Sequence, residues 1–147
     1  MADKPLRERI GVDLARTARL WRTKLDERLA PLGLTQAKWV ALLYLSRADG
    51  GLAQRDLVDQ IGVEGPTLVR VLDGLERMGL IERRDNPNDR RAKTVHLTAA
   101  ATPVLAEISR LAAAFREEIL YGITEDELQV CQRVFERMAL NIADRSR

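Results

Sequence analysis

The chain has 147 residues, of which 46% are hydrophobic and 31% charged, so its composition is that of an ordinary globular domain with enough apolar side chains for a core. No apolar run approaches the roughly 20 residues that span a bilayer. The first nine residues are rich in charge and lack the apolar stretch of a signal peptide, so we expect a cytoplasmic protein that has no membrane partner. A single cysteine and a single histidine exclude an internal disulfide, a Cys-based zinc site and a multi-histidine metal site, and we expect no cofactor.

The net charge says little about partners. Lys and Arg number 24 and Asp and Glu number 22, which gives a formal charge of +2. Nucleic-acid binding would therefore depend on where individual arginines point rather than on bulk charge.

The first two predicted elements are helices. Apolar residues recur every three or four positions from about residue 6 to residue 29, which predicts one amphipathic helix, and Ala30-Pro31-Leu32-Gly33 ends it. Thr35 has the position of an N-cap for a second helix, which we expect to end near Ala48.

Two short helices follow, separated by a tight turn. The third helix fits residues 53–61, and the turn 62–64 leads into a fourth helix with Pro66 in its first turn and Gly79 just past its end. The fourth helix carries an apolar stripe, which consists of Leu68, Leu72, Leu75 and Met78.

The pattern then changes from helix to strand. Residues 80–84 and 94–97 read as two strands joined by the turn-forming segment 85–89, with His96 facing outward on the second strand. Thr98 is the expected N-cap of a fifth helix that ends near Tyr121, and Thr124 and Glu127 form a capping box for a sixth. Cys131 lies among apolar residues of the sixth helix, so we expect it to be buried and structural.

Two short helices joined by a turn, with a hairpin directly after them, indicate a winged helix-turn-helix. The outward face of the second of these helices would carry Pro66, Thr67, Arg70 and Gly74, a surface suited to base edges in the DNA major groove. Gly65 and Gly74 would allow close approach of the backbone. The alternative is a polar face that only meets water.

The hairpin is the second candidate DNA contact. Its basic residues are Arg83, Arg84, Arg90, Arg91 and Lys93. An arginine on a thin loop can enter a narrow minor groove, and Asp89 could orient a neighbouring arginine by an ion pair. The alternative is a solvated turn whose charges keep the tip soluble.

Five stretches of the chain form a set of motifs. They are Leu34-Thr35-Gln36, Gln54-Arg55-Asp56-Leu57, the run from Gly65 to Arg83, Asn88-Asp89-Arg90-Arg91-Ala92-Lys93 and Leu97-Thr98. Together these motifs resemble the MarR family of bacterial transcription regulators. The SlyA branch of that family is similar in particular at Asp13-Leu14-Ala15-Arg16, at Trp21-Arg22 and at Leu34-Thr35-Gln36 before Trp39-Val40. The resemblance covers nearly the whole chain.

The resemblance implies a mainly α fold with a small β-hairpin, built as a winged helix-turn-helix domain (34–98) and a helical dimerisation region (1–33 and 99–147). It implies a homodimer in which Gly65, Pro66, Thr67 and Arg70 lie on the recognition helix. It also places Arg91 in the minor groove, with Asp89 and Arg90 supporting it and Lys93 on the same wing. Gly65 and Ala53 depart from the family pattern, which has a polar residue at the first position and a Ser or Thr cap at the second.

Members of this family often respond to small aromatic or phenolic anions. By position, Arg19, Trp21, Trp39 and Leu43 would border such an effector site, with Arg19 meeting a carboxylate and Trp39 a ring. The alternative is that both tryptophans belong to the core and that Arg19 makes an ion pair.

The sequence therefore predicts a non-enzymatic regulator, such as a repressor, that binds double-stranded DNA as a homodimer on pseudo-palindromic operators. Repression and activation both remain open. The alternative is a winged-helix module that docks protein or RNA and recognises no operator. Salt dependence on duplex DNA discriminates the two, because only a regulator that contacts phosphates loses affinity steeply as salt rises.

Overall fold

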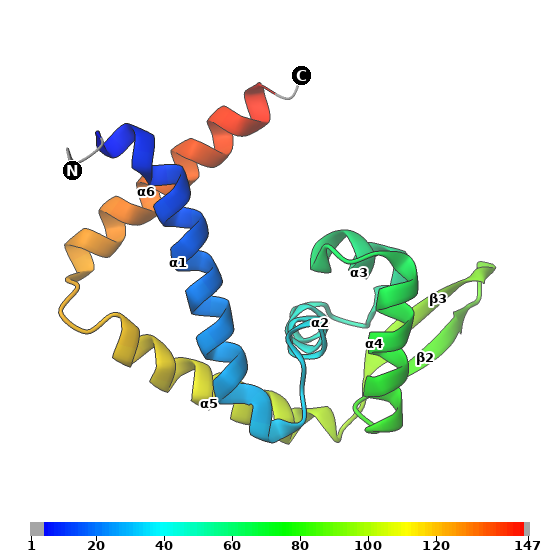
Figure 1. Ribbon diagram of the computed structural model, residues 1–147. Helices are drawn as coiled ribbons and strands as arrows, with labels where there is room; N and C mark the ends of the chain where they lie inside the picture. Colours follow the sequence, from blue (N-terminus) through cyan, green and yellow to red (C-terminus); the bar gives the residue numbers. More distant parts are fainter. Residues whose placement is uncertain (1–4, 146–147) are drawn as a thin grey trace. The chain divides into compact units, whose positions relative to one another are not determined.

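The computed structural model describes residues 5–145, with every side chain in that range except that of Arg90. Figure 1 shows a mostly helical chain with one small antiparallel sheet, which confirms the expected fold class. The elements in chain order are α1 (Leu6–Leu29), η1 (Ala30–Leu32), α2 (Gln36–Arg47), β1 (Leu52–Ala53), α3 (Gln54–Ile61), α4 (Gly65–Arg77), β2 (Ile81–Asn86), β3 (Asp89–Leu97), α5 (Ala101–Ile119) and α6 (Glu125–Asp144). The chain divides into two compact units between Ala113 and Ala114.

Helix α1 has two different halves. At its C-terminal end Leu25 and Leu29 are buried, whereas Leu6 and Ile10 near its start are exposed. A 3-10 turn follows, and Gly33 ends it at a φ of 71°, a left-handed conformation that favours glycine. The predicted helix and its stop are confirmed, but much of its apolar stripe remains uncovered within the single chain.

The core of the first unit lies where α2, α3 and α4 meet the sheet. Its fully buried side chains are mostly leucines, and they are Leu42, Leu57, Leu68, Leu72, Leu75, Ile81 and Val95. Thr35 precedes α2 as expected, although its side chain makes no capping hydrogen bond. This core fixes α4 against the sheet and so determines which face of α4 remains exposed.

The sheet has three strands rather than two, in the order β1-β3-β2. Strand β1 pairs antiparallel with β3 through Leu52 and Val95, and β2 pairs with β3 from Ile81 opposite Leu97. Strands β2 and β3 also extend further toward the turn than the sequence predicted. Their polar residues pair across the ribbon, as in the ion pair between Lys93 Nζ and Asp85 Oδ1 at 2.8 Å.

Thr98 does not cap α5, so that prediction is wrong. Helix α5 begins at Ala101, and the Thr98 hydroxyl donates instead to the carbonyl oxygen of Gly79 at 2.5 Å. The backbone N–H of Thr98 also donates to the carbonyl oxygen of Leu80 at 3.0 Å. Thr98 therefore ties the end of the hairpin to the end of α4.

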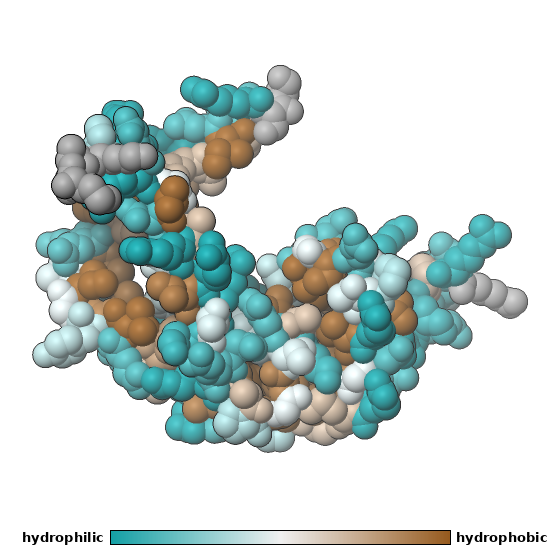
Figure 2. Space-filling model, viewed as in Figure 1, coloured by the Kyte–Doolittle hydropathy of each residue, from teal (hydrophilic) through white to brown (hydrophobic). Residues whose placement is uncertain are grey.

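In the second unit, α6 begins with the predicted capping box. The backbone N–H of Glu127 donates to Thr124 Oγ1 at 3.3 Å, and the backbone N–H of Thr124 donates to Glu127 Oε2 at 2.8 Å. The expectation that Cys131 is buried is wrong: Cys131 is exposed, because no residue of α6 is buried in the single chain. Figure 2 shows apolar side chains uncovered along this helix. Within residues 5–145, no helix is long and apolar enough to cross a membrane.

Candidate nucleic-acid interface

Helix α4 buries one face and exposes the other. Its buried residues are Leu68, Val71, Leu72, Gly74 and Leu75. Pro66 and Arg70 are exposed and Thr67 is half-buried, so the structure places these three on or beside the outward face. Gly65 is the first residue of the helix and is also exposed.

Two residues of α4 differ from their predicted places. Gly74 is buried and faces α2, where an added Cβ would lie 2.7 Å from Lys38 Cε, so it serves helix packing and not an approach to DNA. Met78 is 41% exposed and follows the last turn of the helix. Val71 and Leu75, which share a helical face with Met78, are buried, but Met78 is the C-cap residue beyond the last residue of α4 and is exposed there.

The N-terminal end of α4 has no side-chain cap. Glu64 has the N-cap position, but its carboxylate makes no capping hydrogen bond, and Pro66 occupies the first turn. The first N–H groups of a helix carry partial positive charge and bind anions when no side chain satisfies them. The exposed end of α4 therefore suits a phosphate or a base acceptor.

The wing, which consists of β2, β3 and the turn between them (residues 81–97), presents Arg91 at its surface. Asp89 Oδ1 accepts a hydrogen bond from the backbone N–H of Arg91 at 2.9 Å. Asp89 thus fixes the backbone at the start of β3 rather than pairing with the guanidinium, and Arg91 has no ion-pair partner among the described side chains. The side chain of Arg90 lies outside the described residues.

Arg83 joins the wing to α4. Its guanidinium Nη2 lies 2.5 Å from Asp73 Oδ1, and its Nε lies 3.0 Å from Glu76 Oε2. The side chain of Arg83 is only 21% exposed. The hydrogen bond from Arg83 lowers the pKa of Glu76, and the same bond, together with that to Asp73, raises the pKa of Arg83. Because both acids lie on α4 and Arg83 on β2, this ion-pair cluster holds the wing against α4.

Arg84 and Lys93 of the wing form ion pairs with acidic residues. Arg84 pairs with Glu82 on the same strand, and Lys93 pairs with Asp85 across the ribbon. Among the wing arginines whose side chains the structure describes, Arg91 is therefore the one without an ion-pair partner.

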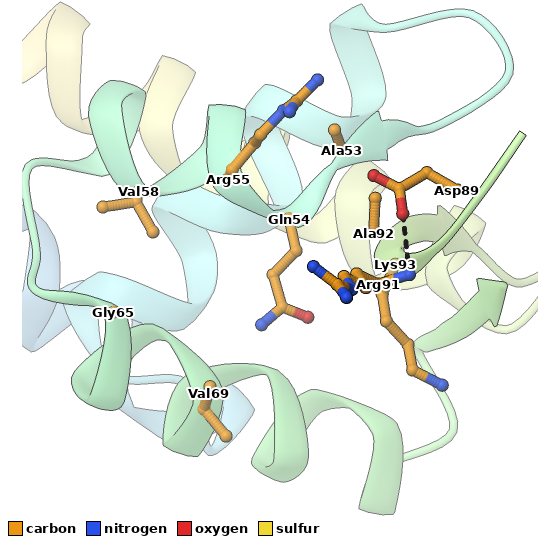
Figure 3. Close-up of a pocket in the computed structure, with 10 residues that line it drawn as sticks. All are labelled: Ala53, Gln54, Arg55, Val58, Gly65, Val69, Asp89, Arg91, Ala92 and Lys93. Carbon is orange, nitrogen blue, oxygen red and sulfur yellow. Dashed lines mark hydrogen bonds between the residues drawn. The ribbon is translucent and has the colours of Figure 1, made fainter. Parts of the chain in front are cut away.

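A cavity of about 470 Å³, hereafter the slot, lies between the start of α3, the outer side of α4 and the wing (Figure 3). It is lined by Ala53, Gln54, Arg55, Val58, Gly65, Val69, Asp89, Arg91, Ala92 and Lys93. Figure 3 shows the Gln54 amide and the Arg91 guanidinium pointing into the slot, whereas Arg55 extends away from it. The sequence pattern did not indicate Gln54 and Val69 as candidate site residues. Gln54 reaches the slot because the β1–β3 pairing, which is non-local, brings the start of α3 to the wing. Val69 is an exposed residue of α4.

His96 is half-buried, so its predicted outward position is wrong. Its Nε2 lies 2.9 Å from Thr94 Oγ1, and its ring packs against Gly51. At Gly51 the φ is +91° and an added Cβ would lie 2.6 Å from the ring, so only glycine fits here. The third strand creates this contact, because β1 brings the preceding loop over the end of β3.

The four predicted effector-site residues line neither the slot nor the next cavity of the described chain. Trp39 is buried, and its Nε1 donates to Asp26 Oδ1 at 3.4 Å, which ties α2 to α1. Arg19 is exposed, and Trp21 and Leu43 are half-buried. A cavity of about 370 Å³ lies instead beside α1, α2 and α3, lined by Arg22, Gln36, Ala37, Val40, Tyr44, Gln60, Ile61 and Val63. No group of three or more His, Cys, Asp or Glu residues in the described part of the chain could hold a metal ion.

Solved structures resemble this chain over nearly its whole length. The crystal structure of transcriptional regulator PA3341 is 47% identical, with 92% of this chain and 98% of that chain covered and a TM-score of 0.82. A transcriptional regulator of the MarR family from Silicibacter pomeroyi is 32% identical, with 97% and 95% covered and a TM-score of 0.78. CouR from Rhodococcus jostii RHA1, solved bound to p-coumaroyl-CoA, shares the fold at 20% identity, with 93% and 96% covered and a TM-score of 0.78.

The family model described as the MarR family matches residues 32–92, which include α2, α3, α4, β2 and the start of β3. The similarity to the relative from Silicibacter pomeroyi covers 97% of the chain. The chain therefore belongs to the MarR family of transcriptional regulators.

Proposed function

We propose that this protein is a sequence-specific regulator that binds double-stranded DNA as a homodimer on pseudo-palindromic operators. The observation that carries the proposal is the pairing of two surfaces in one lobe. Helix α4 exposes Pro66 and Arg70 beside an uncapped N-terminal end, and the wing exposes Arg91 on the other side of the slot. A helix of this kind fits the major groove, and an arginine on a thin ribbon fits the adjacent minor groove.

Arg70 and Arg91 have different proposed roles. The guanidinium of Arg70 can take both acceptors of a guanine in the major groove, which discriminates bases. Arg91 contributes charge and groove-width recognition in the minor groove, with Asp89 holding its backbone and with Arg90 and Lys93 beside it. Thr67 and Gly65 complete the proposed recognition surface at the start of α4.

The proposed dimer interface comes from residues 1–33 and 99–147, with residues 34–98 forming the DNA-binding domain. Apolar side chains are exposed on helices of both terminal regions, and contiguous exposed apolar surface usually marks an interface. They are Leu6, Ile10, Val12 and Leu20 on α1 and Val130, Val134, Phe135, Leu140 and Ile142 on α6. The motifs around residues 13–16, 21–22 and 39–40 support a place in the SlyA branch.

A small aromatic or phenolic anion is the proposed effector. The candidates Arg19, Trp21, Trp39 and Leu43 stay a prediction, and the cavity beside Arg22 and Tyr44 supplies a second place where a cation and a ring meet. The fold-level neighbour CouR holds an aromatic acyl ligand, p-coumaroyl-CoA. Repression is the proposed mode of regulation, relieved when the effector binds.

The test is an equilibrium titration with a duplex selected from a random library and a scrambled duplex of the same composition, each at several salt concentrations. The proposal expects tight binding to the selected duplex, weaker binding to the scrambled one, and a steep loss of affinity for both as salt rises. A protein that selects no sequence, or whose DNA affinity is insensitive to salt, is instead a module that docks protein or RNA.

A further inference from the structure

Gln54 belongs neither to α4 nor to the wing, yet its position is unusual for a polar residue. It is the first residue of α3, it is half-buried, and its amide has no hydrogen-bond partner among the described residues. It lines the slot and also a neighbouring cavity that contains Glu76, Arg83 and Lys93. Figure 3 shows the amide pointing from the start of α3 into the slot, beside the Arg91 guanidinium. Partly buried amides are ordinarily hydrogen-bonded, so this one has capacity left for a ligand.

We propose that the slot seats a phosphodiester of the DNA strand that separates the major groove from the minor groove, and that the Gln54 amide donates a hydrogen bond to it. This inference rests on the proposed DNA-binding function. If α4 lies in the major groove and the wing in the adjacent minor groove, one sugar-phosphate strand must pass between them. The space between α4 and the wing is the slot, and its inner end is formed by α3.

The chemistry of the lining fits a phosphate. The Arg91 guanidinium points into the slot without an ion-pair partner among the described side chains, so its positive charge attracts the phosphodiester that borders the minor groove. The carboxylate of Asp89, the acid that lines the slot, accepts the backbone N–H of Arg91, so its charge is partly satisfied. Small residues line the slot between these groups and let a backbone approach closely; they are Ala53, Gly65 and Ala92.

A phosphate suits Gln54 better than a base edge does. Bases in the major groove face the exposed side of α4, where Arg70 lies. Gln54 belongs to α3, and its amide points into the slot between α4 and the wing. Contacts of this type fix the register of a protein on the duplex without reading sequence. Gln54 is therefore a positioning contact that sets α4 and the wing relative to the DNA backbone.

The first experiment compares Gln54→Glu with Gln60→Glu. Both add one negative charge to the same short helix, but Gln60 is exposed and lines the cavity beside Arg22 instead of the slot. A carboxylate at position 54 repels the phosphate, so we expect a loss of about tenfold for each protomer and about 100-fold for a dimer. Gln60→Glu should change affinity by less than about threefold, because salt screens a charge that is far from any phosphate. Melting curves show whether both variants keep the fold.

The second experiment uses Gln54→Ala, which adds no charge and keeps the inference testable even if Gln54→Glu does not fold. Each phosphate near the centre of a half-site is replaced in turn by an uncharged methylphosphonate. At one position the replacement should weaken the wild-type protein by about tenfold and the Gln54→Ala variant much less, because two changes that remove the same contact are not additive. All other positions should affect both proteins equally.

The two experiments separate this inference from the proposed function. In one outcome, the wild-type protein binds DNA with sequence preference, but Gln54→Glu has the same affinity as Gln60→Glu. This result refutes the slot contact and leaves the proposed function standing. Equal methylphosphonate effects in wild type and Gln54→Ala at every position also overturn the slot contact alone. A wild-type protein that binds no duplex overturns the proposed function, and the slot contact falls with it.

Discussion

The salt dependence of DNA binding should fall when Arg91 is replaced by glutamine and should change little when Arg84 is replaced in the same way. Both arginines lie on the wing, but they differ in what they contact. Arg91 lines the slot and has no ion-pair partner among the described side chains, whereas Arg84 pairs with Glu82 on its own strand. Only an unmatched arginine that meets a phosphate displaces a counterion from DNA.

The magnitude follows from how many DNA phosphates the variant no longer neutralises. Each neutralised phosphate contributes about 0.9 to the slope of log affinity against log salt, so Arg91→Gln removes about 1.8 for a dimer. Over a fourfold rise in salt, from about 50 to about 200 mM, the variant should lose about 12-fold less affinity than the wild type. Arg84→Gln should change the slope by less than about 0.5, since Glu82 already balances its charge.

Fluorescence anisotropy with one labelled duplex at five or more salt concentrations measures both slopes, and circular dichroism melting confirms that both variants are folded. A wild-type slope for Arg91→Gln would mean that the wing is only a solvated turn. Equal reductions for both variants would mean that the wing acts through its total charge, and the specific placement of Arg91 would be refuted.

Three further changes test the fold and the proposed dimer. Leu72→Ala, at a fully buried position of α4, should lower the free energy of unfolding by about 2–5 kcal/mol in urea denaturation, and a decrease below about 1 kcal/mol would contradict the described core. Phe135→Asp, at a residue that is 47% exposed on α6, should turn a dimer into a monomer in analytical ultracentrifugation, whereas an unchanged dimer would exclude this face from the interface. Folding lowers the pKa of Glu76 and Glu127 below their ordinary 4.5, so the unfolded chain takes up protons first as the pH falls; their contribution to stability is present above about pH 4.5 and is lost below it. Thermal melting of the wild type and of Glu127→Gln between pH 3 and 7 measures this, and an equally steep acid loss in both would exclude the capping box as a cause.

Features that depend on neighbouring residues in the chain could be predicted from the sequence. The 3.6-residue pattern of leucines located α4, because burial of one helix face needs only that spacing. The capping box at Thr124 was found for a similar reason, since both of its partners lie within one turn. Gly79, with a φ of 74°, follows α4 where a left-handed residue was expected.

Features that depend on distant residues could not be predicted. Strand β1 has two residues and exists only because it pairs with β3 some forty residues later, and the half-buried place of His96 follows from that pairing. Gly74 looked exposed because the pattern of α4 alone does not reveal that Lys38 of α2 covers it. Thr98 had a cap-like position, but the carbonyl of Gly79 offered its hydroxyl a better partner.

The candidate interface also combines features that neighbouring residues determine with features that distant residues determine. Pro66, Thr67 and Arg70 were placed from the helical period alone, and the structure puts them on or beside the uncovered face of α4. Arg83 had the same basic character as Arg91 in the sequence, but contacts with Asp73 and Glu76 commit it to holding the wing. Which arginine of a basic hairpin remains free for DNA depends on ion pairs that only the folded chain defines.

The most direct test of the central claim is a hydroxyl-radical footprint of the full chain on its selected duplex, together with the stoichiometry of the complex. We predict two chains per duplex and two protected segments related by two-fold symmetry. The centres of the half-sites should lie about 10 bp apart, or a multiple of that distance, with protection of the strand between the major-groove and minor-groove contacts in each half. A single asymmetric protected segment, or one chain per duplex, would contradict the proposed dimeric recognition.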